Sequence, residues 1–367
     1  MGSEMCIRDS SGTSGNGGTQ TWTRQYLNNY KSEDFELVHV NLSARRGLLA
    51  EASFVKRVID GLLDLREVYF DVKRALKSDH YPIMHTATSG SLGTLRDYFL
   101  VKLAKKYKTK SILHCHYGCI KDDYQRGGLL SLLLKKTLPL YDIILVLDSI
   151  SSDFLNSIPK LKGKVHIAPN FINVITDVDL SPRTYKSIAF IGNLVPTKGI
   201  YELVDAVKSL NNGTTLNLIG PATNDIAVEL KSRIGSDEGK SIHTLGRRPN
   251  NEAIAYMEKM DIIALPTYYS SEAFPISILE AMSKGSLVLS CPRAAIPDML
   301  TAVDGGLCGL LVEAKSAKSI ADAILWAQKN TTEADELRRK AFEKVSTCYS
   351  MPVVFDLYSD YYKKMLG

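Results

Sequence analysis

The stretch DIIALPTYYSSEAFPISILEAMSKGSLVLSC, residues 261–291, contains two apolar runs separated by a segment with helical signals. The runs DIIALPTYY (261–269) and SLVLSC (286–291) are rich in apolar and β-branched residues, which is typical of buried strands. Between them, PISILEAMSKG (275–285) has a proline suited to a first helical turn and a glycine suited to a helix C-cap. A strand, a helix and a strand in this order predict a parallel α/β sheet.

The same alternation occurs in two blocks along the chain. The first block has strand-like runs at 35–42, 81–88, 110–117 and 141–148, with an amphipathic helix at 95–108. The second block has strand-like runs at 186–194, 214–222, 241–246, 261–269 and 286–291, with helices at 200–210, 251–260 and 275–285. We therefore expect an α/β fold of two Rossmann-like domains that face each other across a cleft. Their ligands are expected at the carboxyl ends of the strands.

The domain boundary is predicted in the polar, proline-bracketed stretch HIAPNFINVITDVDLSPRTY. We expect a first domain over 12–170, a second over 171–345, and a C-terminal helix over 346–367 that packs back on the first domain. The leader, residues 1–11, looks foreign to the rest and is left out of the predicted fold. Aromatic residues repeat along the last helix at Phe355, Tyr358, Tyr361 and Tyr362, and they are expected to pack rather than to bind a ligand.

Composition and charge limit the class of protein. Of 367 residues, 45% are hydrophobic and 23% charged, as in ordinary globular proteins. The six cysteines show no disulfide spacing, and no apolar run approaches the roughly 18–20 residues of a membrane span, so we expect a cytoplasmic protein. The net charge is +5, yet residues 1–165 hold 24 Lys and Arg against 17 Asp and Glu. This basic half could face anionic lipid or an anionic acceptor, or be a mildly basic solvated surface.

The segment SEAFPISILEAMSKG places two carboxylates eight residues apart. Glu272 precedes the helix, where Ala273, Phe274 and Pro275 could offer backbone N–H groups to a sugar hydroxyl or a phosphate. Glu280 lies inside an apolar helix, and such a carboxylate needs a partner, for example a ribose diol. The alternative is that Glu272 is simply a negative charge at the helix N-terminus and that Glu280 points outward.

A second segment, FIGNLVPTKGIYELVDAV, ends a strand near Gly192 and Asn193 and begins a helix after Lys198. A cation at a helix N-terminus is unfavourable unless an anion compensates, so Lys198 is a candidate ligand for a pyrophosphate. The alternative is a surface lysine. In GTSGNGGTQTWTRQYL, Gly17 and Gly18 lead into a helix and could admit a phosphate or a sugar hydroxyl.

In HCHYG, period-two geometry puts His114 and His116 on one face of a strand. His116 lies nearer the carboxyl end and is the candidate site residue. The alternative for each is a buried, hydrogen-bonded histidine. A metal site of His114, His116 and Cys119 is conceivable but lacks a second ligand cluster.

Together these segments resemble the retaining GT-B glycosyltransferases of family 4, essentially from residue 12 to the C-terminus. Glu272 and Glu280 match the family's E-x7-E signature, FIGNLVPTKG its donor loop, and HCHYG its HLHGG-like segment. HIAPNFIN resembles the interdomain segment P-N-G-[VI]-D, and GLLVEAKSAKSIADAI (309–324) the stretch after the donor site.

The resemblance implies transfer of a sugar from a UDP- or GDP-sugar to a glycan or lipid-linked acceptor with retention. The catalytic residues it implies are Glu272 at the donor sugar, His116 near the anomeric carbon and Lys198 at the leaving diphosphate. Glu280 would hold the ribose. No metal or other cofactor is required, and the setting would be cell-surface polysaccharide synthesis.

Departures from the family pattern leave alternatives open. Asn193 stands where the family often has arginine, Phe171 and Asn173 replace a glycine and an aspartate, and Ala273 replaces a glycine. A non-catalytic sugar-nucleotide-binding subunit, or a sugar-nucleotide epimerase or phosphorylase on the same fold, therefore remains an alternative. The segment RGGLLSLLLKKTL (126–138) could make a peripheral membrane contact, or be a buried helix.

Overall fold

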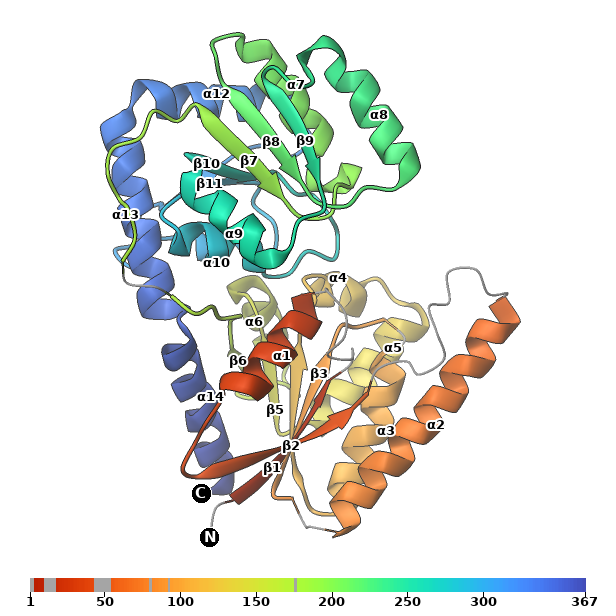
Figure 1. Ribbon diagram of the computed structural model, residues 1–367. Coiled ribbons are helices and arrows are strands. Elements are labelled where there is room, and N and C mark those ends of the chain that lie inside the picture. The colour runs from red at the N-terminus through yellow and green to blue at the C-terminus, as the bar shows by residue number, and fades with distance from the viewer. Residues whose placement is uncertain (1–2, 10–17, 43–53, 79–80, 92, 175–176) are drawn as a thin grey trace. The chain divides into compact units, whose positions relative to one another are not determined.

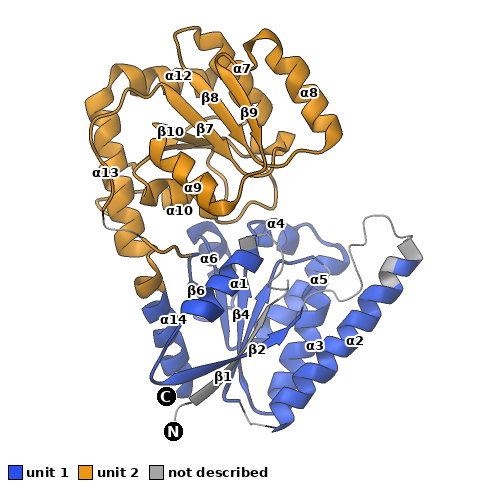
Figure 2. Cartoon of the chain, in the orientation of Figure 1, with its two compact units in different colours: residues 1–170, 355–367 blue, residues 171–354 orange. Residues whose placement is uncertain are grey.

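The computed structural model describes residues 3–9, 18–42, 54–78, 81–91, 93–174 and 177–367 (Figure 1). The chain divides into two compact units (Figure 2). Unit 1 comprises Met1–Asn170 and Phe355–Gly367, and unit 2 comprises Phe171–Val354. Each unit is built on its own six-stranded sheet, and the registered strand pairs are parallel, as the strand–helix alternation predicts.

The sheet of unit 1 has the strand order β2-β1-β3-β4-β5-β6. Its strands are β1 (Ser3–Asp9), β2 (Phe35–Asn41), β3 (Ile83–Thr88), β4 (Lys110–Cys115), β5 (Ile143–Val146) and β6 (Val165–Ile167). The predicted runs at 35–42, 81–88, 110–117 and 141–148 are confirmed as strands. Sequence reading did not predict the short strand β6.

The expectation that residues 1–11 lie outside the fold is wrong for Ser3–Asp9. These residues form β1, which lies between β2 and β3 in the sheet. Met5 is in register with Leu37 of β2 and with Ile83 of β3. The physical reason is that backbone groups make the ladder, and any non-proline residue can supply them.

Helices cover both faces of this sheet (Figure 1). α2 (Phe54–Ser78), α3 (Gly93–Lys106) and α5 (Gly128–Thr137) lie together on one face, whereas α1 (Gly18–Asn29) lies beside α14 (Met351–Leu366) on the other. Two shorter helices are α4 (Ile120–Gln125) and α6 (Ser149–Asn156). Val68, Val72 and Leu76 of α2 pack in one core with Leu100 of α3 and Leu134 of α5.

The aromatic residues of α14 attach the C-terminal segment to unit 1. Tyr358 and Tyr362 are fully buried, so the prediction that this stripe packs is confirmed. Trp22 Nε1 of α1 donates a hydrogen bond of 3.3 Å to the Tyr358 hydroxyl, and the hydroxyls of Tyr26 and Tyr362 lie 2.9 Å apart. The predicted segment boundary at 346 differs from the structure, because unit 2 continues to Val354.

The sheet of unit 2 has the order β12-β11-β10-β7-β8-β9. Its strands are β7 (Ser187–Ile191), β8 (Thr215–Ile219), β9 (Ile242–Gly246), β10 (Ile262–Leu265), β11 (Leu287–Ser290) and β12 (Leu310–Leu311). Its helices are α7 (Ile200–Leu210), α8 (Asn224–Ile234), α9 (Asn250–Lys259), α10 (Ile276–Ser283), α11 (Ile296–Met299), α12 (Ala317–Lys329) and α13 (Thr331–Cys348). All predicted strands and helices of this block are present.

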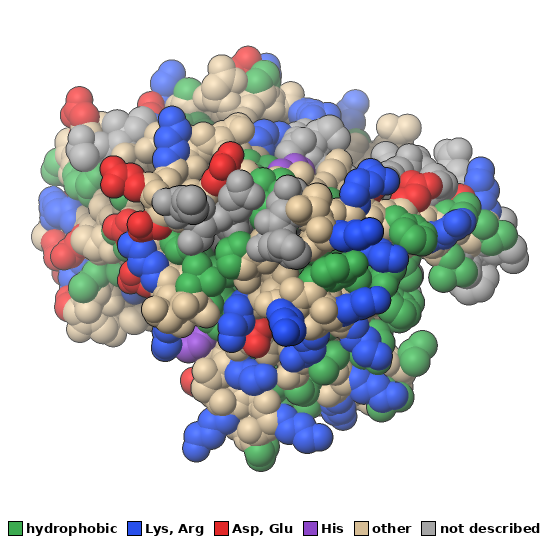
Figure 3. Space-filling model, turned by 90° about the horizontal axis from the view of Figure 1, so that it is seen from below, with side chains coloured by type: hydrophobic (Ala, Val, Ile, Leu, Met, Phe, Trp, Pro, Cys, Tyr) green, Lys and Arg blue, Asp and Glu red, His purple; other side chains and the backbone are tan. Residues whose placement is uncertain are grey.

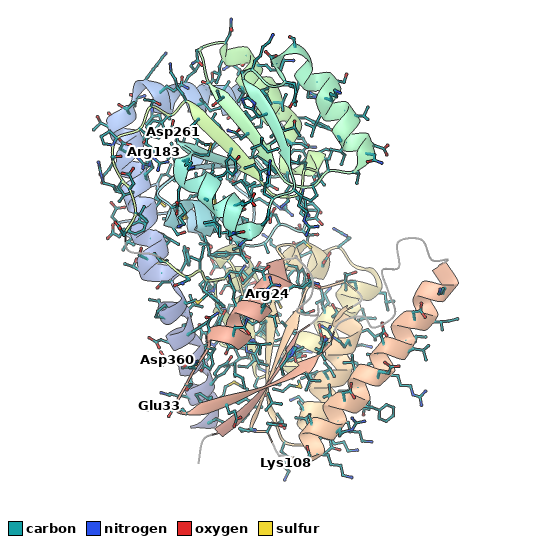
Figure 4. The ribbon with its side chains drawn as sticks, in the orientation of Figure 1. Arg24, Glu33, Lys108, Arg183, Asp261 and Asp360 are labelled. Carbon is teal, nitrogen blue, oxygen red and sulfur yellow. The ribbon has the colours of Figure 1, made fainter. Side chains whose placement is uncertain are left out.

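Polar side chains hold the segment that leads into β7 against the rest of unit 2. Arg183 donates to the backbone carbonyls of Glu258 and Met260, and Asp261 accepts from the N–H groups of Lys186 and Ser187 (Figure 4). These contacts set the start of β7 next to β10. The two strands that carry the candidate site are therefore anchored at their amino ends.

Candidate functional site

The candidate site of unit 2 lies where the strand order reverses. β7 pairs with β8 on one side and with β10 on the other, so the connections from these strands diverge at this point. In open parallel sheets, ligands bind outside the carboxyl ends of strands at such a switch point. The segments that follow β7 and β10 contain most of the residues that the sequence singles out.

After β7, a tight turn places Lys198 at the carboxyl edge of the sheet. Gly192 continues the ladder by donating its N–H to Ile219 at 3.0 Å, and the Asn193 side chain is exposed. A short 3-10 helix, Pro196–Lys198, follows, and Gly199 then begins α7 in a left-handed conformation with φ of +77°. Lys198 is therefore just outside the helix, as predicted.

After β10, the loop places Glu272 beside that lysine. Lys198 Nζ lies 3.4 Å from Glu272 Oε2, with side chains only 21% and 12% exposed. The Thr267 hydroxyl lies 3.4 Å from the same carboxylate oxygen. Tyr268 donates its N–H to the Thr197 carbonyl at 2.9 Å, which joins the two loops. Two of the predicted catalytic residues are thus brought into one ion pair.

The start of α10 is built from buried residues. Ala273 and Phe274 are buried, the Phe274 ring packs edge-on against Tyr349 at 5.3 Å, and Pro275 is the N-cap. The Ala273 carbonyl accepts a hydrogen bond from Ala295 at 3.1 Å. This packing fixes the loop that carries Glu272.

Glu280 lies one turn into α10 and is only partly exposed. Burial raises the pKa of its carboxyl to about 7, and a hydrogen bond with Asn250 opposes that shift. The alternative of a Glu280 that simply points into solvent is wrong, because its side chain is only partly exposed. A carboxylate in this setting gains from a hydroxyl donor such as a ribose diol.

In unit 1, His116 follows β4 directly and belongs to a buried aromatic cluster. Its ring centroid lies 4.1 Å from that of His114 and 4.5 Å from that of Trp22. His114 Nε2 lies 3.2 Å from the Ala168 carbonyl, so the interpretation of His114 as a buried, hydrogen-bonded residue is confirmed. His116 Nε2 is buried and has no hydrogen-bond partner among the described residues.

The electrostatics of this cluster favour neutral rings. Burial lowers the pKa of His114 to about 3. Burial lowers the pKa of His116 well below its usual range, with the neighbouring His114 and His85 as further causes and the Asn170 side chain opposing them. A neutral imidazole can accept a proton or a hydrogen bond, which suits a ring that meets a sugar hydroxyl.

The remaining predicted residues are the two glycines predicted to lead into the first helix. Gly17 lies outside the described residues, and Gly18 is the first residue of α1 in unit 1. Sequence reading missed three supporting residues: Thr267 beside Glu272, Asn250 beside Glu280, and Asn170 beside His116. Of these three, only Asn170 could have been found from the sequence, because it lies in the HIAPNFIN segment that resembles the family's interdomain segment.

Two negative findings concern the part of the chain that the structure describes. Those residues include no group of three or more His, Cys, Asp or Glu placed to hold a metal ion. Over the same residues, none of the helices has the length and apolar character required to cross a bilayer.

Comparison with known proteins identifies relatives of this arrangement. Residues 173–344 match the family described as Glycosyl transferases group 1. The D-inositol 3-phosphate glycosyltransferase of Corynebacterium glutamicum (strain R) is 33% identical over 153 residues, 39% of this chain and 35% of the relative. The amylovoran biosynthesis glycosyltransferase AmsK of Erwinia amylovora is 22% identical over 174 residues, 46% of this chain and 42% of the relative. The chain spans less than half the length of either relative.

Solved structures show the same fold. Anabaena Alr3699/HepE in complex with UDP superposes with a TM-score of 0.74 at 14% identity, over 99% of this chain and 100% of that chain. The same protein in complex with UDP-glucose gives a TM-score of 0.70 at 15% identity, over 98% and 99%.

The fold and the site define the class: an α/β chain of the GT-B type, with two parallel-sheet units. Residues 173–344, which lie in its second unit, match the family of glycosyl transferases group 1.

Proposed function

We propose that this protein is a glycosyltransferase that moves a sugar from a UDP- or GDP-sugar to a glycan or lipid-linked acceptor with retention of anomeric configuration. The observation that carries the proposal is the ion pair of Lys198 and Glu272 at the switch point of a group 1 domain. UDP and UDP-glucose bound to HepE support a nucleotide sugar as donor.

Each donor residue has a proposed task. Lys198 stabilises the charge that develops on the leaving diphosphate, next to the backbone at Gly192 and Asn193. Glu272 orients the donor sugar, with Ala273, Phe274 and Pro275 supplying the loop backbone. Glu280 accepts hydrogen bonds from the ribose, and Gly17 and Gly18 are proposed as further donor-binding residues. Because the Lys198–Glu272 pair is mostly buried, the electrostatic interactions of these two side chains are stronger than they would be in water.

The proposed reaction breaks the bond from the anomeric carbon to the diphosphate oxygen, and the electron pair stays on the diphosphate. The acceptor hydroxyl adds to the same face of the sugar and releases its proton to the departing phosphate oxygen. His116, held neutral by burial, lines the sugar pocket near the anomeric carbon. We propose that no metal takes part, because Lys198 supplies the positive charge.

The proposed setting is the cytoplasm and cell-surface polysaccharide synthesis. The cysteines Cys115, Cys119, Cys291, Cys308 and Cys348 make no disulfide, which suits a reducing compartment. Its relative AmsK is an amylovoran biosynthesis glycosyltransferase, which supports the polysaccharide setting. We also propose a peripheral contact with the inner face of a membrane.

The test measures release of nucleoside diphosphate from a panel of UDP- and GDP-sugars with a native glycan and lipid extract as acceptor. Lys198→Ala and Glu272→Ala should each lower kcat/KM roughly 10- to 150-fold, the equivalent of losing a charged contact of about 1.5–3 kcal/mol. Lys318→Ala is the matched control, because Lys318 also forms an ion pair, with Asp322, but on exposed α12.

Three results would contradict the proposal in different ways. Equal turnover by wild type and both site variants would remove the site assignment. Donor binding without turnover against the extract would favour a non-catalytic subunit. A new sugar isomer in proton NMR of the donor incubated alone would favour an epimerase.

A further inference from the structure

We infer that α2, α3 and α5 form a docking surface for an anionic phospholipid bilayer, and we call their exposed side the three-helix face. This inference rests on the proposed function for its setting, a lipid-linked acceptor. It assigns the surface to three helices, of which the sequence pointed only to α5.

α2 has apolar residues on its buried side and a second stripe of apolar residues on its exposed side. At about 100° per residue, Ile59, Leu62, Leu63 and Phe70 lie on one face of the helix. All four are exposed, and Leu62 is 56% exposed. The same stripe contains Arg66, between Leu63 and Phe70, and then Lys73, Arg74 and Lys77. The opposite side holds Val68, Val72 and Leu76, which are buried in the core.

α3 repeats this arrangement. Leu95 and Phe99 are exposed near its start, and Lys102 and Lys106 are exposed toward its end. These positions are spaced by three or four residues, so they share one helix face. The opposite side of α3, including Leu100 and Leu103, is buried.

α5 has the same order of side chains. Leu129 and Leu132 are 83% and 51% exposed, and Lys135 and Lys136 follow them on the exposed side. Leu134 is buried. The alternative of a wholly buried helix over this segment is therefore wrong for its outer side.

The exposed stripes of the three helices belong to one surface, because the helices cover the same face of the sheet (Figure 1). Each of these helices begins toward the carboxyl edge of the sheet, the edge at which His116 follows β4. The exposed apolar residues and cations of the three helices therefore share one surface, and the last cations of each helix lie away from that edge. Figure 3 shows Lys and Arg side chains gathered with hydrophobic ones between them at the ends of these helices.

The net charge of the three helices is strongly positive. Together they contain twelve Lys and Arg against five Asp and Glu. This difference equals the whole positive excess of residues 1–165. Lys108 and Lys110 follow α3 directly and add two more cations, and Figure 4 labels Lys108 at the lower end of unit 1.

The combination of exposed apolar side chains and cations favours an anionic lipid bilayer as the partner of the three-helix face. Exposed Leu, Ile and Phe side chains can enter the acyl boundary while Lys and Arg extend to anionic headgroups. The acidic residues of α2 do not interrupt the stripe, since Asp60, Asp64, Glu67 and Asp71 fall on one flank of the helix at about 100° per residue. A second copy docked by two-fold symmetry would set cations against cations.

The test is co-sedimentation of the full chain with vesicles. One set is phosphatidylcholine alone, and the other is phosphatidylcholine mixed with phosphatidylglycerol. We expect sedimentation with the anionic set and weakening as sodium chloride is raised, because salt screens exposed charges.

Two variants and one control locate the surface. Lys135→Gln with Lys136→Gln should lower partition into anionic vesicles roughly 10- to 30-fold, at about fivefold for each lysine. Leu129→Ser with Leu132→Ser should also lower partition, and the loss should persist at high salt. The matched control is Val228→Ser with Lys231→Gln on α8 of unit 2, which alters an exposed apolar residue and a lysine at the same spacing.

Equal sedimentation with neutral and anionic vesicles, or an equal loss in the α8 control, would overturn the inference. A dimer in sedimentation velocity that the leucine variant dissociates, without vesicle binding, would also overturn it in favour of a second copy. Donor turnover, measured as nucleoside diphosphate release by the same variants, separates the two proposals. Lost vesicle binding with intact donor turnover would contradict only the docking surface, and bound vesicles without turnover would contradict only the proposed function.

Discussion

Gly199 lies so close to Pro266 that a Cβ atom on the glycine would fall 2.3 Å from the proline carbonyl oxygen. The contact joins the turn after β7 to the loop after β10. It places Lys198 and Glu272, which lie 74 positions apart in the chain, within one ion pair. Because Gly199 also has φ of +77°, no other residue fits this position without displacing the backbone.

Gly199→Ala should therefore destabilise unit 2 and weaken donor binding. The left-handed conformation alone costs about 1 kcal/mol, and the collision with Pro266 adds to it. Thermal unfolding and donor calorimetry measure both effects. Gly213→Ala is the control, since Gly213 has φ of +81° but open space around it. Equal loss in both variants would show that the contact with Pro266 has no role.

Donor affinity should rise with pH through the neutral range. Glu280 has a pKa of about 7 in the free protein, raised by burial. Hydroxyl donors from a ribose stabilise the ionised carboxylate, so binding lowers this pKa and is stronger once the group is charged. Calorimetry of UDP binding between about pH 6 and pH 8 should show this rise, and Glu280→Gln should flatten it. A pH-independent affinity in the wild type would exclude Glu280 from the ribose contact.

The same carboxyl predicts a stability effect of opposite direction. Since its pKa is raised in the folded state, the folded protein binds the proton more tightly than the unfolded chain does. Its contribution to the free energy of unfolding is therefore present in acid and lost as pH rises through about 7. Glu280→Gln should remove this loss, which denaturant unfolding at several pH values would reveal.

The histidine cluster should make unit 1 sensitive to acid. Burial holds the pKa of His114 at about 3, so the ring stays neutral in the folded protein, whereas the unfolded chain binds a proton below about pH 6.5. Stability should then fall as pH drops below that value. His114→Asn should reduce the slope of unfolding free energy against pH. An unchanged slope in His114→Asn would contradict the assignment.

The hydroxyl of Tyr358 should matter for the attachment of α14. It accepts from Trp22 and donates to the Pro169 carbonyl at 3.2 Å, all in a buried setting. Tyr358→Phe should cost about 1–3 kcal/mol in unfolding free energy, since these partners remain buried. Tyr361→Phe, which removes an exposed hydroxyl bonded to Ile167, should cost less. The reverse order would show that burial does not control the cost.

The local sequence predicted most of the elements. Apolar runs bounded by polar segments identified β2 to β5 and β7 to β11, and helical spacing identified α3, α7, α9 and α10. It failed for β1, whose residues look foreign, and for β6 and β12, which are two or three residues long. β6 and β12 have too few side chains to show a period. Backbone pairing with neighbouring strands defines all three of these strands.

The candidate site divides in the same way. The sequence by itself determined which residues are chemically suited: Glu272, Glu280, Lys198 and His116 could be named from residue type, spacing and family resemblance. Only the tertiary structure decided which of them meet, how far burial shifts the pKa of Glu280, and that Thr267, Asn250 and Asn170 support them. The physical reason is that contact and desolvation depend on segments far apart in the chain, whereas residue type and spacing are local.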